Sequence, residues 1–184
     1  MGPTDEQLIK GCIKGDRESQ QALYAKFSGQ MYVVCLRYAK EQQEAEDILQ
    51  ESFIKVFDSI KNFRGDSKLV YWIKRIVVNT ALNANRSKLY LYPMVDVDEM
   101  KEVSDGELHV SDFTMDELLK MINELPDGCQ VIFNLYAIEG YKHHEIAKML
   151  EITEGTSKSQ YARAKYLLKE QMLKAMPGLS KSKQ

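Results

Sequence analysis

The chain has 184 residues, 44% of them hydrophobic and 28% charged, and its formal net charge is −2 at pH 7. No apolar run approaches the roughly 20 residues that a membrane-spanning helix needs, so we expect a globular protein without membrane insertion. The first residues lack a basic patch followed by an apolar core, so we expect no secretory signal and a cytoplasmic location. Cys12, Cys35 and Cys129 form no C-x-x-C pair. We interpret them as buried apolar residues rather than metal or disulfide ligands.

The charge is separated along the chain. Residues 40–60 carry two basic and six acidic residues, a net −4, whereas residues 61–92 carry a net +6. Residues 93–127 carry a net −9, and residues 142–184 a net +5. Because Lys and Arg contacts to phosphates hold proteins on DNA, both basic segments are candidates for nucleic-acid contact. The −9 segment is either a solvated linker or a segment that repels phosphate and covers a neighbouring basic face.

Apolar residues recur at helical spacing, and strand-like alternation is nearly absent, so the sequence predicts an all-α fold. The first domain, residues 4–90, is expected to hold four helices at 5–15, 17–39, 43–59 and 67–88. Thr4 or Asp5 is the expected N-cap of the first helix, and Gly15 ends it. Their predicted core positions are Leu8, Ile9, Cys12, Ile13, Leu23, Phe27, Met31, Val34, Cys35, Tyr38, Ala45, Ile48, Leu49, Phe53, Val56, Phe57, Leu69, Trp72, Ile73, Ile76, Val77 and Leu82.

Beyond the fourth helix the composition changes. Residues 91–112 contain scattered acids with no sustained helical face and predict a linker. A second small helical domain is expected at 113–176, beginning with a helix at 114–124 that has Met115, Leu118, Leu119 and Ile122 on its apolar face. A turn at "LPDG" follows. Residues 177–184 predict a flexible tail.

The stretch "HHEIAKMLEITEGTSKSQYARAKYLL" predicts a helix-turn-helix. Apolar contacts of the first helix and the turn come from Ile146, Ala147, Leu150 and Ile152, and Thr153 is the expected N-cap of the second helix. Ser157, Tyr161, Ala164 and Leu168 are spaced to face the first helix. The outward positions are Lys158, Ser159, Ala162, Arg163 and Lys165, which suit a helix that enters the major groove. The alternative is an ordinary helix pair with a basic face.

Two further surfaces are expected in the first domain. The acidic segment exposes Glu44, Glu46, Asp47, Gln50 and Glu51 on a helix, which suits a basic protein partner or is merely a solvated face. The basic segment interleaves Phe63, Tyr71, Trp72 and Tyr90 with Arg64, Lys68, Lys74, Arg75, Arg86 and Lys88, and aromatic and cationic groups together suit single-stranded DNA. We place Trp72 in the core and take Tyr71 as the exposed aromatic, with Asn79 and Asn83 as candidates for hydrogen bonds to bases.

Both regions resemble one family. "LPDGCQVIFNLYAIEGYKHHEIAKMLEITEGTSKSQYARAKYLLKEQM" looks like region four of extracytoplasmic-function sigma factors of the sigma-70 family, and "EAEDILQESFIKVFDSIKNFRGDSKLVYWIKRIVVNTALNANR" is similar to region two. The resemblance implies a transcription initiation factor that binds core RNA polymerase and promoter DNA, both duplex and melted, in a bacterial cytoplasm. It also suggests an anti-sigma partner. No catalytic residue, cofactor or metal is expected.

The resemblance assigns residues to three surfaces. For core polymerase these are Glu44, Glu46, Asp47, Ile48, Gln50, Glu51 and Phe53. For the melted promoter element they are Phe63, Arg64, Ser67, Lys68, Tyr71, Lys74, Arg75, Asn79, Asn83 and Arg86. For the upstream element they are Thr156, Lys158, Ser159, Gln160, Ala162, Arg163 and Lys165.

The chain departs from the family pattern at four positions. Glu151 stands where the turn usually has Gly, which costs roughly 1 kcal/mol if the backbone there is left-handed. Ser157 replaces a common aliphatic residue, Gln160 replaces a common basic one, and Leu69 stands where an aromatic is frequent.

The competing function is a stand-alone dimeric helix-turn-helix regulator, which would bind a palindromic duplex without polymerase. A helical interaction scaffold is a weaker alternative. An enzyme is not expected, because the chain has only three histidines and no Gly-rich phosphate loop or nucleophile–base arrangement. His143 and His144, at a helix start, are interpreted as solvated or capping residues.

Overall fold

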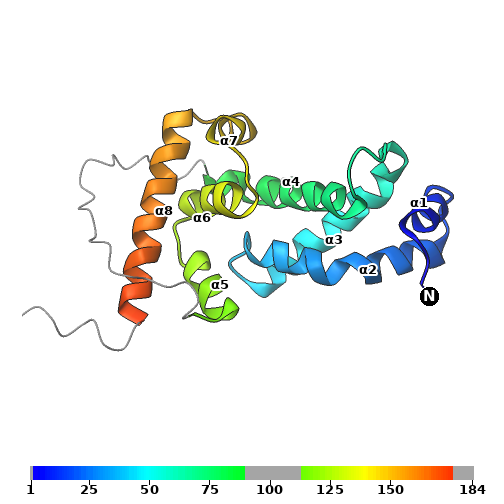
Figure 1. Ribbon diagram of the computed structural model, residues 1–184, viewed down its shortest axis with the longest axis horizontal. Coiled ribbons are helices and arrows are strands. Elements are labelled where there is room, and N and C mark those ends of the chain that lie inside the picture. The colour runs from blue at the N-terminus through cyan, green and yellow to red at the C-terminus, as the bar shows by residue number, and fades with distance from the viewer. Residues whose placement is uncertain (1, 90–112, 176–184) are drawn as a thin grey trace, which may run out of the picture. The chain divides into compact units, whose positions relative to one another are not determined.

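The computed structural model describes residues 2–89 and 113–175, and within these ranges the chain is helical with no β-strand. The all-α prediction is therefore confirmed. The chain divides into two compact units, residues 1–86 and 87–184 (Figure 1). The predicted linker at 91–112 and the predicted tail at 177–184 lie outside the described residues.

The first unit contains four α-helices and a short 3-10 helix. They are α1 (Asp5–Ile13), α2 (Arg17–Leu36), α3 (Gln42–Ser59), η1 (Ile60–Asn62) and α4 (Leu69–Leu89). Of the two expected caps, Thr4 begins α1: its Oγ1 accepts a hydrogen bond from the Gln7 backbone N–H at 3.3 Å, and Gln7 Oε1 accepts one from the Thr4 N–H at 2.9 Å. This reciprocal capping box satisfies two backbone donors that the helix itself leaves unpaired.

The core of the first unit follows the predicted apolar positions closely. Leu23, Met31 and Cys35 on α2 and Ala45 and Val56 on α3 are fully buried where these two helices pack together. One prediction is wrong: the side chain of Ile13 is 52% exposed. The reason is that α1 ends at Ile13 and the chain turns at Gly15, whose φ of +74° lies in the left-handed region.

Four other predicted core positions lie only partly in the core. They are the half-buried side chains of Ile9, Phe57, Trp72 and Ile76. Three helix limits also differ from the predictions: α1 ends at Ile13 rather than residue 15, α2 ends at Leu36 rather than near residue 39, and α4 begins at Leu69 rather than residue 67.

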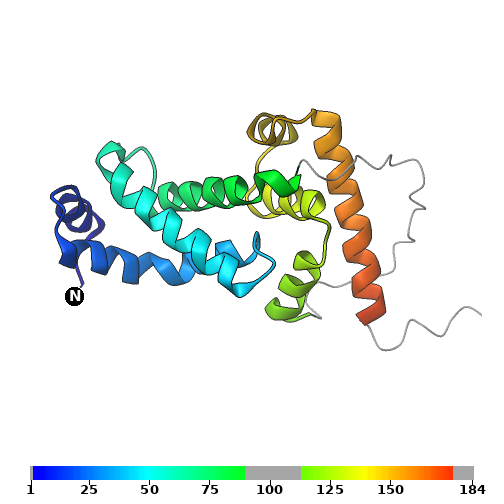
Figure 2. The ribbon, with the colours of Figure 1, turned by 180° about the vertical axis from the view of Figure 1, so that it is seen from behind.

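The second unit contains α5 (Met115–Asn123), α6 (Asp127–Phe133), the π-helical turn η4 (Asn134–Ile138), α7 (His143–Leu150) and α8 (Glu154–Ala175). In Figure 2, α7 and α6 lie along the N-terminal part of α8, and α5 lies nearer its C-terminal part. Leu125, Cys129 and Ala164 form a buried cluster, and Leu168, which was expected to face the first helix of the motif, packs against this cluster. Met115 is also not a core residue, because it is 67% exposed at the first position of α5.

The turn of the helix-turn-helix has the predicted chemistry. Glu151 follows α7 with φ 57° and ψ 40°, a left-handed conformation in a non-glycine residue. The Ile152 N–H then donates to the Ala147 carbonyl at 3.0 Å and closes the end of α7. Thr153 is the predicted N-cap of α8: its Oγ1 accepts from the Thr156 N–H at 3.0 Å.

Candidate nucleic-acid and protein interfaces

The outer face of α3 is acidic with one apolar side chain in it. Asp47, Gln50 and Glu51 are exposed, and Ile54, one helical turn after Gln50 and Glu51, is 61% exposed. Glu51 pairs with Lys55 at 2.6 Å, and both side chains remain largely in solvent. We name Asp47, Gln50, Glu51 and Ile54 the α3 face. An acidic surface around one exposed aliphatic residue suits a basic partner that can bury the isoleucine.

Sequence reasoning missed Ile54 and chose other apolar residues of the same helix. Ile48 and Phe53 are only 2% exposed, so their side chains stabilise the helix from the core side and do not belong to the α3 face. Phe53 packs edge-to-face against Tyr24 with ring centroids 4.7 Å apart. The spacing of Ile54, seven residues after Asp47 and three after Glu51, was the signal that could have identified it.

Glu44 and Glu46, also expected on this surface, are half-buried in the first turns of α3. Their carboxylates accept hydrogen bonds from the Lys40 backbone N–H at 2.9 Å and from the Gln42 amide at 2.8 Å. They therefore help to order the start of the helix, where acidic side chains are favourable.

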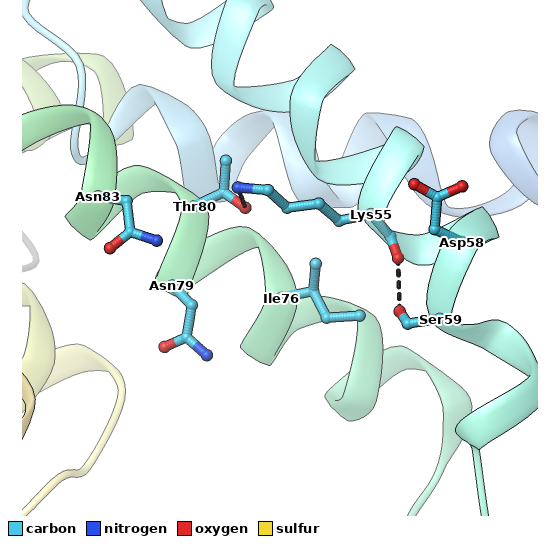
Figure 3. A pocket seen from close by; sticks show the side chains of 7 residues that line it. All are labelled: Lys55, Asp58, Ser59, Ile76, Asn79, Thr80 and Asn83. Atoms are coloured by element: carbon cyan, nitrogen blue, oxygen red, sulfur yellow. Dashed lines mark hydrogen bonds between the residues drawn. The ribbon is translucent and has the colours of Figure 1, made fainter.

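A groove of about 410 Å³ lies between α3 and α4 (Figure 3). It is lined by Lys55, Asp58, Ser59, Ile76, Asn79, Thr80 and Asn83. Figure 3 shows Asn79 and Asn83 towards one end, Asp58 and Ser59 towards the other, and the Lys55 side chain between them. The Lys55 ammonium donates to Thr80 Oγ1 at 3.3 Å and so joins the two helices.

The groove has the chemistry of a site for an unstacked nucleotide. Asn79 and Asn83 are exposed amides that can both donate to and accept from a base edge, and Lys55 can attract a phosphate. Ile76 supplies an apolar wall in the same lining. The sequence predicted both asparagines. Thr80 lies next to Asn79 on α4, whereas Lys55 and Asp58 line the groove because α3 packs beside α4.

The loop before α4 places further predicted residues near the start of that helix. Phe63 packs edge-to-face on Trp72 with centroids 5.5 Å apart, which shields part of both rings. Gly65 has φ +79°, so the loop bends at a position where other residues are strained. Tyr71 is 59% exposed, in agreement with its expected role as the solvent-facing aromatic.

The remaining predicted residues of this surface are charged or polar. Arg64, Ser67, Lys68 and Arg75 are exposed, and Lys74 is half-buried. Arg86 belongs to α4, but its side chain lies outside the described part of the structure, as does all of Tyr90.

On α8 the predicted residues separate into an outward and an inward group. Lys158 and Lys165 are exposed, while Ser159, Ala162 and Arg163 are half-buried. We name these five residues the α8 face. Thr156 is only 9% exposed and shares a hydrogen bond of 2.7 Å with the Thr153 hydroxyl. Gln160 is turned to α6, where its Oε1 accepts from the Cys129 thiol at 3.0 Å.

His143 differs from its interpretation as a solvated or capping residue. Its ring stacks on Tyr136 with centroids 4.2 Å apart, and its Nδ1 lies 2.9 Å from the hydroxyl of Ser157 on α8. Its pKa is lowered, first by burial and then by the positive charge of Lys158. His144, the next residue, is exposed. The pattern of one histidine at a helix start gave no sign of this contact with α8.

The three cysteines are buried and free, as predicted. Burial raises the pKa of the Cys35 thiol to about 12 and that of Cys129 to about 11, although the charge of Arg163 opposes the second rise. Within the described ranges, no group of three or more His, Cys, Asp or Glu residues could hold a metal ion. None of the helices there is long and apolar enough to cross a membrane.

One helical unit carries a groove between two helices and the other a helix-turn-helix, which is typical of DNA-binding proteins. Comparison with known proteins identifies the family. The Sigma-70 region 2 family matches residues 23–89, and the Sigma-70 region 4 family matches residues 115–168. The RNA polymerase sigma-H factor of Pseudomonas aeruginosa is 30% identical over 173 residues, which cover 88% of this chain and 90% of that protein.

Two further comparisons agree. The ECF RNA polymerase sigma-E factor of Salmonella typhimurium is 30% identical over 174 residues, 88% of this chain and 91% of that protein. The structure of the sigma factor RpoE in complex with the anti-sigma factor NepR from Bartonella quintana has a TM-score of 0.50 at 19% identity, covering 84% of this chain and 96% of that one, which shows a shared fold. The chain belongs to the sigma-70 family, as an extracytoplasmic-function sigma factor that directs transcription initiation.

Proposed function

We propose that the three surfaces divide the work of promoter-directed initiation between the two units. The α3 face binds core RNA polymerase, the groove between α3 and α4 together with Tyr71 holds the melted strand, and the α8 face reads the upstream element as duplex. The domain limits that this requires are residues 4–90 and 113–176, joined by 91–112. The observation that carries the proposal is the groove lined by Asn79 and Asn83, because a regulator that binds only duplex has no use for a single-strand site.

The electrostatics support the same division. The α3 face is acidic and would repel phosphates, so it suits protein rather than DNA. The segment that holds α4, which forms one side of the groove, and the segment that holds α8 are both basic. Each can therefore approach DNA while α3 contacts the polymerase.

An anti-sigma partner and a cytoplasmic location complete the proposal. The sigma factor RpoE, whose fold is similar, forms a complex with the anti-sigma factor NepR. A partner of this kind would regulate the present chain by covering its polymerase-binding and DNA-binding surfaces. The chain acts as an initiation factor without catalytic chemistry of its own, in the compartment where RNA polymerase works.

The test is transcription of fragmented genomic DNA by sigma-free core RNA polymerase, with and without this protein, followed by mapping of the transcript starts. We expect a small set of new starts that share two upstream elements at fixed spacing. Absence of new starts, together with failure to co-elute with core enzyme, would refute the proposal. Binding of the free protein to a palindromic duplex as a dimer would instead support the stand-alone regulator.

A further inference from the structure

Four side chains connect the helices of the helix-turn-helix. Tyr136 comes from η4, His143 begins α7, and Ser157 and Tyr161 lie on α8. The Tyr136 ring lies 4.2 Å from His143 and 4.5 Å from Tyr161, and His143 meets Tyr161 edge-on at 5.8 Å. We name these four residues the His143 clasp.

Within the clasp, Ser157 provides the hydrogen-bonding contact between α8 and α7. Its side chain is fully buried, and its hydroxyl lies 2.9 Å from His143 Nδ1. An aliphatic residue at position 157 would fill the same space but could not hydrogen-bond the imidazole. The histidine and the serine therefore form a polar contact across the turn, and burial makes the loss of either partner costly.

The clasp adjoins the α8 face that reads DNA in the proposed function. Lys158 follows Ser157 directly, and the Lys165 ammonium lies 5.2 Å from the centre of the Tyr161 ring. A shift of His143 would therefore move the segment of α8 that presents these cations. Such small displacements weaken contacts that need fixed geometry.

The surroundings of His143 disfavour a positive charge on its ring. Burial lowers the His143 pKa most, Lys158 on α8 lowers it further, and Glu154, which is paired with Lys158 at 2.9 Å, opposes them with a smaller effect. The N-terminus of α7, where His143 lies, carries the positive end of the helix dipole. The other charged or titratable groups nearby are Lys165 beside Tyr161, the two tyrosines, and Lys142, His144 and Glu145 at the start of α7.

We propose that His143 is a positioning residue for the DNA-reading helix, and that the clasp holds α8 most firmly while the imidazole is neutral. At neutral pH, Nδ1 and the Ser157 hydroxyl share one proton in a hydrogen bond. Adding a proton to the ring places a charge between the α7 N-terminus and Lys158 and weakens the clasp. The proposal rests on the proposed role of α8 in promoter reading.

The sign of the pH effect follows from linkage. The pKa of His143 in the folded protein lies below that of a free histidine, about 6.5. The clasp therefore contributes its full stabilisation above that pH and loses it as the pH falls towards the folded-state value. Promoter contact by α8 should weaken in the same interval.

The first experiment follows the imidazole signals of the full chain by NMR as the pH is lowered. We expect His143 to titrate at lower pH than a free histidine, and Ser157→Ala to move the titration of His143. Titration of His143 at the pH of a free histidine, unchanged by Ser157→Ala, would overturn the proposal without reference to DNA.

The second experiment measures binding of the reconstituted holoenzyme to a promoter fragment found by start-site mapping, between pH 7.5 and 5.5. His143→Phe keeps an aromatic ring on Tyr136 but cannot be protonated, and His144→Phe is the matched control. We expect the unaltered chain and His144→Phe to lose affinity roughly threefold more than His143→Phe over this interval. Equal losses in all three would overturn the proposal.

Arg163→Ala separates failure of the clasp from failure of the proposed function. If promoter binding at pH 7.5 falls with Arg163→Ala while the His143→Phe profile matches the unaltered one, the α8 face reads DNA but His143 does not position it. If Arg163→Ala and Lys158→Ala both leave promoter binding unchanged, the reading role of α8 is refuted, and with it the role of His143 in DNA reading.

Discussion

At the scale of single residues, Glu151 shows how a turn can be preserved at a cost. Its φ of 57° is one that glycine adopts without strain, whereas a side chain there costs of the order of 1 kcal/mol. The turn persists because the Ile152 N–H closes α7 on the Ala147 carbonyl and because Thr153 caps α8. Local hydrogen bonds therefore hold a conformation that residue 151 itself disfavours.

We expect Glu151→Gly to raise the free energy of unfolding of the second unit by up to about 1 kcal/mol, because it removes this backbone strain. Hydrogen exchange of the α7 and α8 amides in the full chain measures the change. Lys148→Gly, at an exposed position inside α7, is the matched control and should lower stability by about 1 kcal/mol. Faster exchange in Glu151→Gly would contradict the strain argument.

The cysteines give a second expectation at this scale. Because the folded-state pKa values of Cys35 and Cys129 are raised to about 12 and about 11, their thiols stay protonated in the native protein at pH 8. We expect alkylation by iodoacetamide to be far slower in the native chain than in denaturant. Since the folded pKa values exceed that of an unfolded thiol, about 8.5, stability should fall as the pH rises from there towards 11 and 12. A thiol that reacts at the unfolded rate in native protein would show that it is accessible.

At the scale of single helices, α3 has two opposite faces, one packed in the core and the other exposed to solvent. Ala45, Ile48 and Val56 pack inward, whereas Asp47 and Ile54 face solvent. The exposed isoleucine is the kind of central apolar contact around which interface energy concentrates.

We expect Ile54→Asp to weaken binding to core RNA polymerase by roughly 2 kcal/mol, or about 30-fold, because a carboxylate replaces the apolar anchor. Titration of labelled protein with core enzyme measures the change. Val33→Asp is the control, since Val33 is 45% exposed on α2 and belongs to no proposed surface. Equal affinities of the Ile54→Asp and Val33→Asp proteins would remove Ile54 from the interface.

The groove gives the corresponding expectation for α4. Replacement of Asn79 and Asn83 by Ala should lower holoenzyme affinity for a single-stranded promoter oligonucleotide by about 0.5–1.5 kcal/mol for each lost hydrogen bond, with core binding unchanged. Fluorescence anisotropy with the labelled strand measures it. Gln21→Ala removes an exposed amide from α2 and is the control. A double variant that binds the strand as well as the unaltered chain would exclude these amides from strand contact.

At the scale of the whole molecule, the charge distribution explains how a chain of net charge −2 serves DNA recognition. The basic segments that hold α4 and α8 are separated along the sequence by the acidic segment 93–127. Neither needs to bind DNA strongly alone. Attachment to polymerase brings both to one duplex, and the resulting effective concentration makes two weak contacts strong.

We therefore expect neutralisation of the acidic linker to raise the DNA affinity of the free protein. The changes are to the corresponding amides at Asp96, Asp98, Glu99, Glu102, Asp105 and Glu107, all outside the described residues. Electrophoretic mobility shifts at several salt concentrations measure the effect, which should shrink as salt screens it. Unchanged affinity at low salt would reject a repulsive role for the linker.

The sequence by itself determined the helices, the cap at Thr153, the buried cysteines and the family, and it reduced the first cap to Thr4 or Asp5. These features depend on the spacing of apolar residues and on backbone chemistry, both of which can be read directly from the sequence. Tertiary packing decided the rest. It left Ile54 rather than Ile48 on the α3 face, brought Lys55 and Asp58 of α3 into one groove with Asn79, and turned Thr156 and Gln160 inward. It also placed His143 against Ser157. Each of these placements depends on which neighbouring helix packs against a given face. The helical spacing of apolar residues predicts that a helix has an apolar face, but not which helix will cover it.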